Sequence, residues 1–351
     1  MGLGMGSFAT VAALGILLTS PSLADPAPDR FPMVMLAALA AAVLTYAIVE
    51  RRQTGRLDSI TRQLGVRTLV LLPVAIALDV ALGAASSGLR VPLHLDSVGT
   101  ILVAVLCGPF AGALTGLVAA VLAGALLPAP FGIPSAASFA VVGVLTGLLA
   151  GGFTGIGAFR PRPRRRARAV LGAIVVIVAA LAGLALIAWG ALAGVGPVPL
   201  SALDEADSSL AALGWVGAFV VVGGLLGGLA RLLLLRDVTI ASVVVAGALI
   251  GLATGAVRAF IGGWVLDGRT GSGMDGLVVA LGDRGADAWP AVVGASLVID
   301  PLDRIVSSLA VSVAVAAIAV GTRARFPQAE WIVADDDDFA LRVGSSMRAT
   351  R

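Results

Sequence analysis

Charged side chains interrupt long apolar runs of this chain, and these residues are the first candidates for chemistry. Asp79 lies inside the apolar run 68–86, and Arg258 lies near the end of the run 238–262. An ionisable side chain inside a membrane-length apolar run is energetically costly, so its presence indicates a functional site. A binding site is therefore expected near these positions.

The last long apolar run, 291–321, contains three charged residues close together. Asp300 and Arg304 are four residues apart, which places them on one face of a helix, and Asp303 lies next to that face. With Asp96, Asp275 and Arg258, they are expected in the outer half of the membrane. Charged groups that gather at one depth are typical of the few polar anchors in an otherwise apolar small-molecule pocket.

A purely structural role for these charges is the alternative. In that interpretation Asp300 neutralises Arg304, Arg258 pairs with Asp303, and the pairs only hold the helices together. The residue types and spacings are compatible with both interpretations.

The elements that position these residues are expected to be membrane helices. Hydrophobic residues make up 58% of the 351 residues and charged residues only 13%, whereas a soluble domain carries about 25% charge. The apolar runs do not alternate with polar positions, which argues against a barrel. The sequence therefore predicts an all-α, polytopic membrane helix bundle with about 9–10 transmembrane helices.

Composition also excludes several function classes. All 24 positive charges are Arg, so no Walker A lysine is available and an ATP-driven step requires a partner. The single Cys and single His exclude an intrachain disulfide and a His-rich metal site. No nucleophile–base arrangement accompanies the carboxylates, so we expect no catalytic residue, no metal, no cofactor and no enzymatic activity. The small net charge of +3 offers no reason to expect nucleic-acid binding.

Arginine clusters set the expected orientation. The connector 50–67 and the segment 160–168 are rich in Arg, and the positive-inside rule places such segments in the cytoplasm. Alternating the remaining spans then puts every Arg cluster on that side. The C-terminus is expected there too, in a multi-pass protein of the cell membrane.

Residues 94–116 combine a polar start with an interrupted apolar run. Pro109 lacks an N–H and restrains Gly108, so one helix is expected to end near Cys107 and the next to begin near Phe110. Gly112 and Gly116 share one helix face, which permits close contact with another helix.

The chain is expected to divide into six segments. They are a signal-like or first transmembrane segment at 1–32, an extra span with a basic connector at 33–66, four helices at 67–160, a basic loop with two inserted spans (169–193 and 213–235) at 161–237, two helices at 238–325 with an outer loop at 263–289, and a disordered acidic tail at 326–351.

Three stretches together resemble the substrate-binding S components of energy-coupling factor (ECF) transporters. They are Leu95-Asp-Ser-Val-Gly-Thr-Ile-Leu through Gly116, Gly247 through Gly276, and Ile299-Asp-Pro-Leu-Asp-Arg-Ile-Val-Ser307. The first is similar to the second and third helices of the family, the second to its fifth helix and following loop, and the third to its last helix. The family more usually has Lys at the place of Arg304. The resemblance covers about 67–160 and 238–325, so the spans outside these ranges are additions to a six-helix core.

The resemblance implies a function in transport. It implies a bacterial membrane subunit that captures a water-soluble vitamin or precursor, while a transmembrane coupling subunit and ATP-binding subunits supply the energy. The substrate contacts are then expected at Asp96, Thr100, Arg258, Asp275 and Asp300, supported by Asp303 and Arg304. Ala77, Ala81 and Ala85 lie at the spacing with which the first helix of the family docks on the coupling subunit.

Two other functions remain open. One is a membrane sensor or scaffold whose charge network is structural and which transports no ligand. The other is a membrane-embedded enzyme that uses the outer carboxylates. Nothing in the sequence identifies the ligand.

Overall fold

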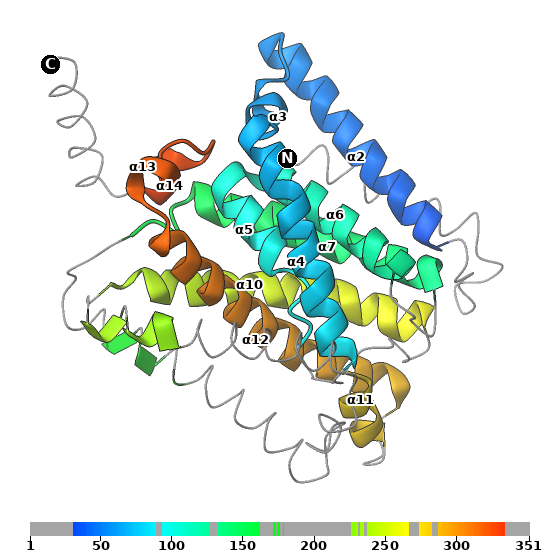
Figure 1. Ribbon diagram of the computed structural model, residues 1–351. Helices are drawn as coiled ribbons and strands as arrows, with labels where there is room; N and C mark the ends of the chain where they lie inside the picture. The colour runs from blue at the N-terminus through cyan, green and yellow to red at the C-terminus, as the bar shows by residue number, and fades with distance from the viewer. Residues whose placement is uncertain are drawn as a thin grey trace, which may run out of the picture.

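The computed structural model describes six ranges, 31–88, 93–126, 132–161, 237–266, 274–282 and 287–333, with a few residues of 171–178 and 226–234. These residues form helices and no strands, which confirms the predicted all-α bundle (Figure 1). The first apolar segment, most of the two inserted spans and the run Asp335–Asp338 lie outside the described residues.

Five of the described helices are long and apolar enough to cross a membrane. The chain is therefore a multi-pass membrane protein. The membrane-length segments are Met33–Thr54, Val66–Ser86, Pro109–Leu126, Ser138–Gly155 and Thr239–Trp264. They belong to α2 (Phe31–Thr54), α4 (Val66–Gly88), α6 (Pro109–Leu126), α7 (Gly132–Gly155), and α10 (Thr239–Phe260) with its π-helical continuation η2 (Ile261–Val265).

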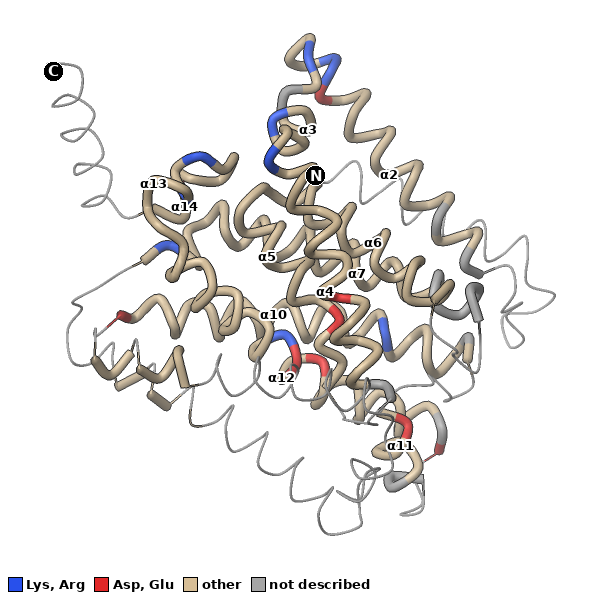
Figure 2. The backbone as a smooth tube through the Cα atoms, in the orientation of Figure 1, with Lys and Arg blue, Asp and Glu red and all other residues tan. Residues whose placement is uncertain are grey.

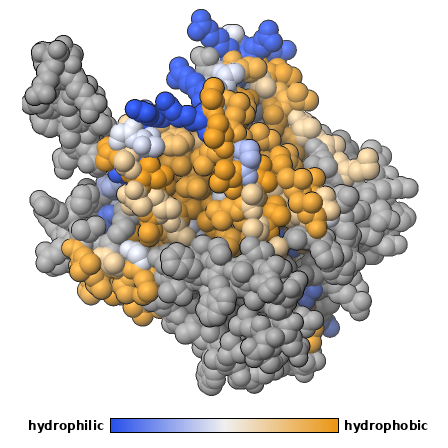
Figure 3. Space-filling model, in the orientation of Figure 1, coloured by the Kyte–Doolittle hydropathy of each residue, from blue (hydrophilic) through white to orange (hydrophobic). Residues whose placement is uncertain are grey.

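The outer surface of the bundle is apolar, as a lipid-facing surface must be. Leu69, Val70 and Val74 on α4 are each more than half exposed. Apolar side chains cover much of the face in Figure 3, and hydrophilic ones gather at its upper end. Water would not favour such a surface, whereas hydrocarbon accommodates it without cost.

The short helix α5 (Val98–Cys107) lies at the centre of the bundle. Nine of its ten residues are buried, and it contacts α4, α6, α7 and α12 (Ala288–Ala317). The break predicted at Gly108-Pro109 is confirmed, because α5 ends at Cys107 and α6 begins at Pro109. Gly108 has a φ of +121°, a conformation that a side chain would strain.

Glycines let the neighbouring helices approach closely, as their spacing predicted. A Cβ built on Gly116 would lie 2.4 Å from the carbonyl oxygen of Gly143 on α7. The contact of α10 with α12 is equally close, since a Cβ on Gly251 would lie 2.3 Å from Cα of Pro301. These contacts fix the separation of α10 and α12, which carry most of the charged residues of interest.

Two segments expected to lack regular structure contain helices. The expected outer loop 263–289 contains α11 (Asp275–Gly282), which packs on α12. The expected disordered tail follows α13 (Val320–Arg323) and begins with residues that pack against the bundle. The backbone N–H of Gln328 donates a hydrogen bond to the carbonyl oxygen of Leu106 on α5. Ile332 in α14 (Ala329–Ile332) is fully buried. Each is a short helix stabilised by tertiary packing, which a scan for long apolar runs overlooks.

Candidate functional site

Arg258 and Asp300 form a buried ion pair between α10 and α12. Their Nε and Oδ1 atoms are 2.9 Å apart, and the two side chains are 6% and 0% exposed. No hydrogen bond joins these two atoms, so the contact is an ion pair. Gly255 lies one turn before Arg258, and a Cβ there would be 3.1 Å from Cβ of Asp300. The absence of a side chain at this position lets the two helices bring the charges together. The guanidinium also lies over the ring of Phe139, 5.3 Å from its centroid.

A second guanidinium, that of Arg304, joins α12 to the segment before α5. Its Nη1 donates to Asp303 Oδ2 at 2.9 Å, to Asp96 Oδ1 at 3.2 Å, and to the Ser97 hydroxyl. Arg304 is fully buried, so these contacts replace the water that its charge would otherwise require.

Asp96 bridges the two guanidiniums. Its Oδ2 lies 3.6 Å from Nη2 of Arg258, while its Oδ1 faces Arg304. The Asp96 side chain is 40% exposed, whereas the two arginines and their partners Asp300 and Asp303 are buried. Burial alone would raise the pKa of Asp96, but Arg304 and Arg258 outweigh burial and hold the pKa well below its usual range. The carboxylate is therefore ionised at neutral pH. Acidic and basic positions meet in the middle of the bundle, near α4 and α12 (Figure 2).

We call these five residues the charge cluster: Asp96, Arg258, Asp300, Asp303 and Arg304. The structure thus brings together five of the seven residues predicted as substrate contacts or their supports. The pairing differs from the alternative inferred from spacing, because Arg258 pairs with Asp300 and Arg304 with Asp303 and Asp96. Position on one helix face did not decide the pairing; the close packing of α10 on α12 and the position of Asp96 did.

Thr100 lies in the same region but is engaged in a helix cap. Its hydroxyl and its backbone N–H both donate to Asp79 Oδ2, at 2.7 and 2.9 Å, and the N–H of Gly99 donates to Asp79 Oδ1 at 2.6 Å. Asp79 on α4 thereby satisfies two of the free N–H groups at the start of α5. The intramembrane carboxylate of Asp79 accordingly has a structural role.

Asp275, the remaining predicted contact, is the first residue of α11. The ion pairs that join the charge cluster do not include it. Among the described residues, no group of three His, Cys, Asp or Glu side chains could hold a metal ion.

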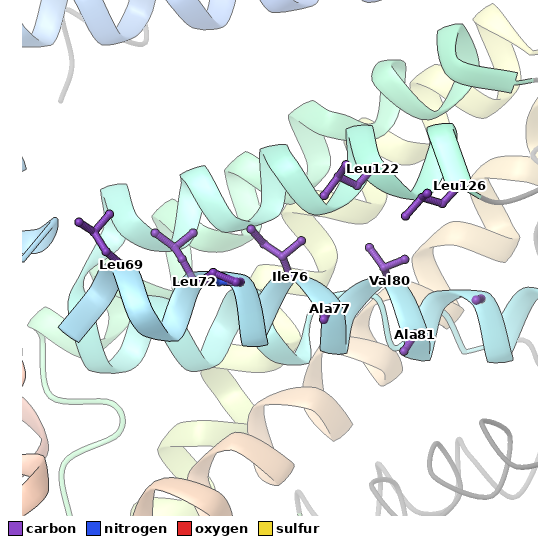
Figure 4. Close-up of a pocket in the computed structure, with 10 residues that line it drawn as sticks. Leu69, Leu72, Ile76, Ala77, Val80, Ala81, Leu122 and Leu126 are labelled. Carbon is purple, nitrogen blue, oxygen red and sulfur yellow. The ribbon is translucent and has the colours of Figure 1, made fainter. Parts of the chain in front are cut away.

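The alanine stripe of α4 is divided between two environments. Ala77 and Ala81 line an apolar groove of about 530 Å³ between α4 and α6 (Figure 4). Ala85 is only 2% exposed, and Ala84 lines the groove in its place. Ala85 lies eight residues after Ala77, which rotates it about 80° around the helix axis from Ala77. Ala84 lies seven residues after Ala77 and is rotated by only about 20°, so it stays on the same face. The groove is also lined by Leu72, Ile76, Leu122 and Leu126, among others.

His94 belongs to the site although the sequence did not single it out as a contact. It is 8% exposed, and neither ring nitrogen has a hydrogen-bond partner among the described residues. Burial and the positive charges of Arg258 and Arg304 lower its pKa to about 3, so the ring is neutral at pH 7. The sequence feature that could have indicated His94 is that it is the only histidine of the chain and lies two residues before Asp96.

Comparison of the chain with protein-family models finds no match, and comparisons with curated proteins and with solved structures find none either.

Proposed function

We propose that the protein is a membrane-embedded substrate-capture subunit for the ATP-driven uptake of a small micronutrient of the water-soluble vitamin class. The observation that carries the proposal is Asp96, a partly exposed carboxylate that bridges two buried guanidiniums inside a bundle of apolar, membrane-length helices. Buried charges are costly to maintain, and a few convergent polar groups are typical of small-molecule sites.

The proposed orientation rests on the distribution of arginine. Basic residues gather at the α2–α3 turn, along α3 (Asp58–Gln63), and near α13, at one end of the molecule (Figure 2). The positive-inside rule assigns that end to the cytoplasm. The segment 93–97 follows the opposite end of α4 and thus faces outward, where a nutrient would arrive. The membrane is then the bacterial cell membrane, with the C-terminus inside.

The proposed partners follow from the groove and from the missing lysine. The resemblance to S components assigns the face with Ala77 and Ala81 to a transmembrane coupling subunit, and the groove there is open and apolar. Small side chains let a second helix approach closely in a membrane. ATP-binding subunits would supply the energy, because this chain has no lysine with which to build a Walker A site.

The experiment that tests this function measures unfolding temperature and uptake. The detergent-purified protein is heated with each of a panel of water-soluble vitamins and precursors. A ligand at 100 times its dissociation constant stabilises by about 2.7 kcal/mol. We expect one compound to raise the unfolding temperature without ATP, and uptake of that compound to require the partner subunits. No stabilisation across the panel and no partner-dependent uptake would contradict the proposal.

A sensor or scaffold is the second candidate. The observation in its favour is that every charge of the cluster already has a partner within the protein. This function predicts that no small molecule stabilises the protein and that a soluble signalling protein binds the segment 326–351. Turnover of a substrate by the purified chain alone would instead indicate an enzyme.

A further inference from the structure

His94 is a buried polar side chain whose hydrogen-bonding capacity is unused. Its backbone is fixed, because its carbonyl oxygen accepts a hydrogen bond from the Ser86 hydroxyl at 2.6 Å. Its ring, by contrast, has no partner among the described residues at either nitrogen, although it is 8% exposed. A buried polar group without a partner destabilises the folded protein, and most buried polar groups in proteins are paired. Asp300 and the Nε atoms of Arg258 and Arg304 also lack hydrogen bonds, but these groups form ion pairs, whereas His94 forms none among the described residues.

The charged groups around His94 are, in contrast, matched within the protein. Arg258 pairs with Asp300, and Arg304 pairs with Asp303. Asp96 bridges both guanidiniums. A ligand need not supply a charge to complete these contacts, and either sign of added charge would meet a like charge nearby.

We propose that His94 is the specificity-determining contact of this site, and that it recognises a neutral group that presents a hydrogen-bond donor beside an acceptor. A carboxamide, a cyclic urea, a lactam or an aminopyrimidine edge has this character. This inference rests on the proposed substrate-capture function and specifies the chemical class of its ligand.

A neutral imidazole is suited to such a group. It offers one N–H donor and one lone-pair acceptor, and the ring remains uncharged because burial and Arg258 lower the pKa of His94. A site that forms hydrogen bonds with its ligand strongly rejects compounds that lack the matching groups, because its own buried polar atoms then remain unpaired.

The first test needs no knowledge of the ligand. His94→Leu replaces the ring with an apolar side chain of similar volume, and His94→Gln retains both a donor and an acceptor. If the ring has no structural partner, the ligand-free His94→Leu protein unfolds at the wild-type temperature or above it. A fall of more than about 3 °C in His94→Leu that His94→Gln does not show would assign the ring a structural hydrogen bond and overturn the proposal.

The second test measures binding to the same three proteins. The probes are biotin, riboflavin, thiamine and nicotinamide, which carry a neutral donor–acceptor edge, and choline, nicotinate and succinate, which do not. We expect a binding compound from the first group to lose more than tenfold in affinity in His94→Leu and less than threefold in His94→Gln. Thr115→Val is the control, because Thr115 bonds only within its own helix and should leave affinity unchanged.

The outcomes separate this inference from the proposed function. Preferential binding of choline, nicotinate or succinate, or unchanged affinity in His94→Leu, would overturn the role of His94 and leave substrate capture in place. Absence of binding by every probe, together with absence of partner-dependent uptake, would contradict substrate capture itself and this inference with it.

Discussion

The backbone N–H of Leu95 donates a hydrogen bond of 2.8 Å to Oδ1 of Asp303, across 208 residues of sequence. Leu95 has a φ of +50°, a conformation that non-glycine residues seldom adopt. The bond thus holds a strained residue directly before Asp96 and ties the segment 93–97 to α12. This segment carries Asp96, so the charge cluster depends on its position.

Asp300→Asn should destabilise the protein far more than Asp96→Asn. The first change removes the buried partner of Arg258, and breaking a buried pair costs about 3 kcal/mol in the free energy of unfolding. Asp96→Asn should cost less than about 1 kcal/mol, because its side chain is 40% exposed and both guanidiniums keep a buried carboxylate. Thermal unfolding in detergent compares the two variants. Equal losses would show that the cluster acts as one unit.

The same two variants should both weaken ligand binding by more than tenfold, about 1.4 kcal/mol. Affinity is measured by titration below the unfolding temperature of each variant. Unchanged affinity in Asp300→Asn would remove this residue from the binding site and favour the structural interpretation of the cluster.

Gly251→Ala should separate α10 from α12. The added methyl would lie 2.3 Å from Cα of Pro301, a distance that forces backbone to move, and overpacking of this kind costs about 1–3 kcal/mol. Gly152→Ala on α7 is the matched control, because nothing lies within 4 Å of a Cβ there. We expect a lower unfolding temperature only for the first variant. A similar result for both would indicate that the α10–α12 contact adapts easily.

Thr100→Val distinguishes a helix cap from a substrate contact. The variant keeps the shape of the side chain but loses the hydroxyl that donates to Asp79 at 2.7 Å, which should cost about 1 kcal/mol of stability. Ligand affinity should remain within twofold of wild type. A large loss of affinity with unchanged stability would restore Thr100 as a direct contact.

Ala81→Leu should block association with the proposed coupling subunit while sparing ligand binding. The larger side chain would fill part of the groove between α4 and α6 and prevent close approach of another helix. Val74→Leu is the control, since Val74 is 65% exposed on the same helix but does not line the groove. Co-purification with the partner subunits provides the measurement. Intact assembly of the Ala81→Leu protein would place the interface elsewhere.

Stability should depend on pH through His94. The folded protein has a His94 pKa of about 3, whereas the unfolded chain has the ordinary value of 6.5. Between these values the unfolded state binds the additional proton, so the free energy of unfolding falls as the pH decreases below 6.5. The difference in the free energy of unfolding between wild type and His94→Leu should therefore change with pH over this window, with a slope that corresponds to the uptake of about one proton on unfolding. A difference that is constant with pH would show that the ring titrates normally when the protein is folded.

The sequence alone determined the class of the protein and the position of most helices. Membrane-length apolar runs require helices, because only internal hydrogen bonds satisfy the backbone in hydrocarbon. The break between α5 and α6 was equally local, since Pro109 has no N–H to donate. The charged positions in α10 and α12 stood out for a similar reason: their cost in a membrane is a property of the residue type.

Only the tertiary structure decided which of these residues meet. Helix periodicity relates residues within one helix but says nothing of the rotation of α10 against α12, and that rotation pairs Arg258 with Asp300. The same limit applies to Asp79, whose partners are on α5, and to His94, whose isolation is visible only once its surroundings are known. Contacts between distant segments depend on packing, and in this protein glycines at the helix contacts set that packing.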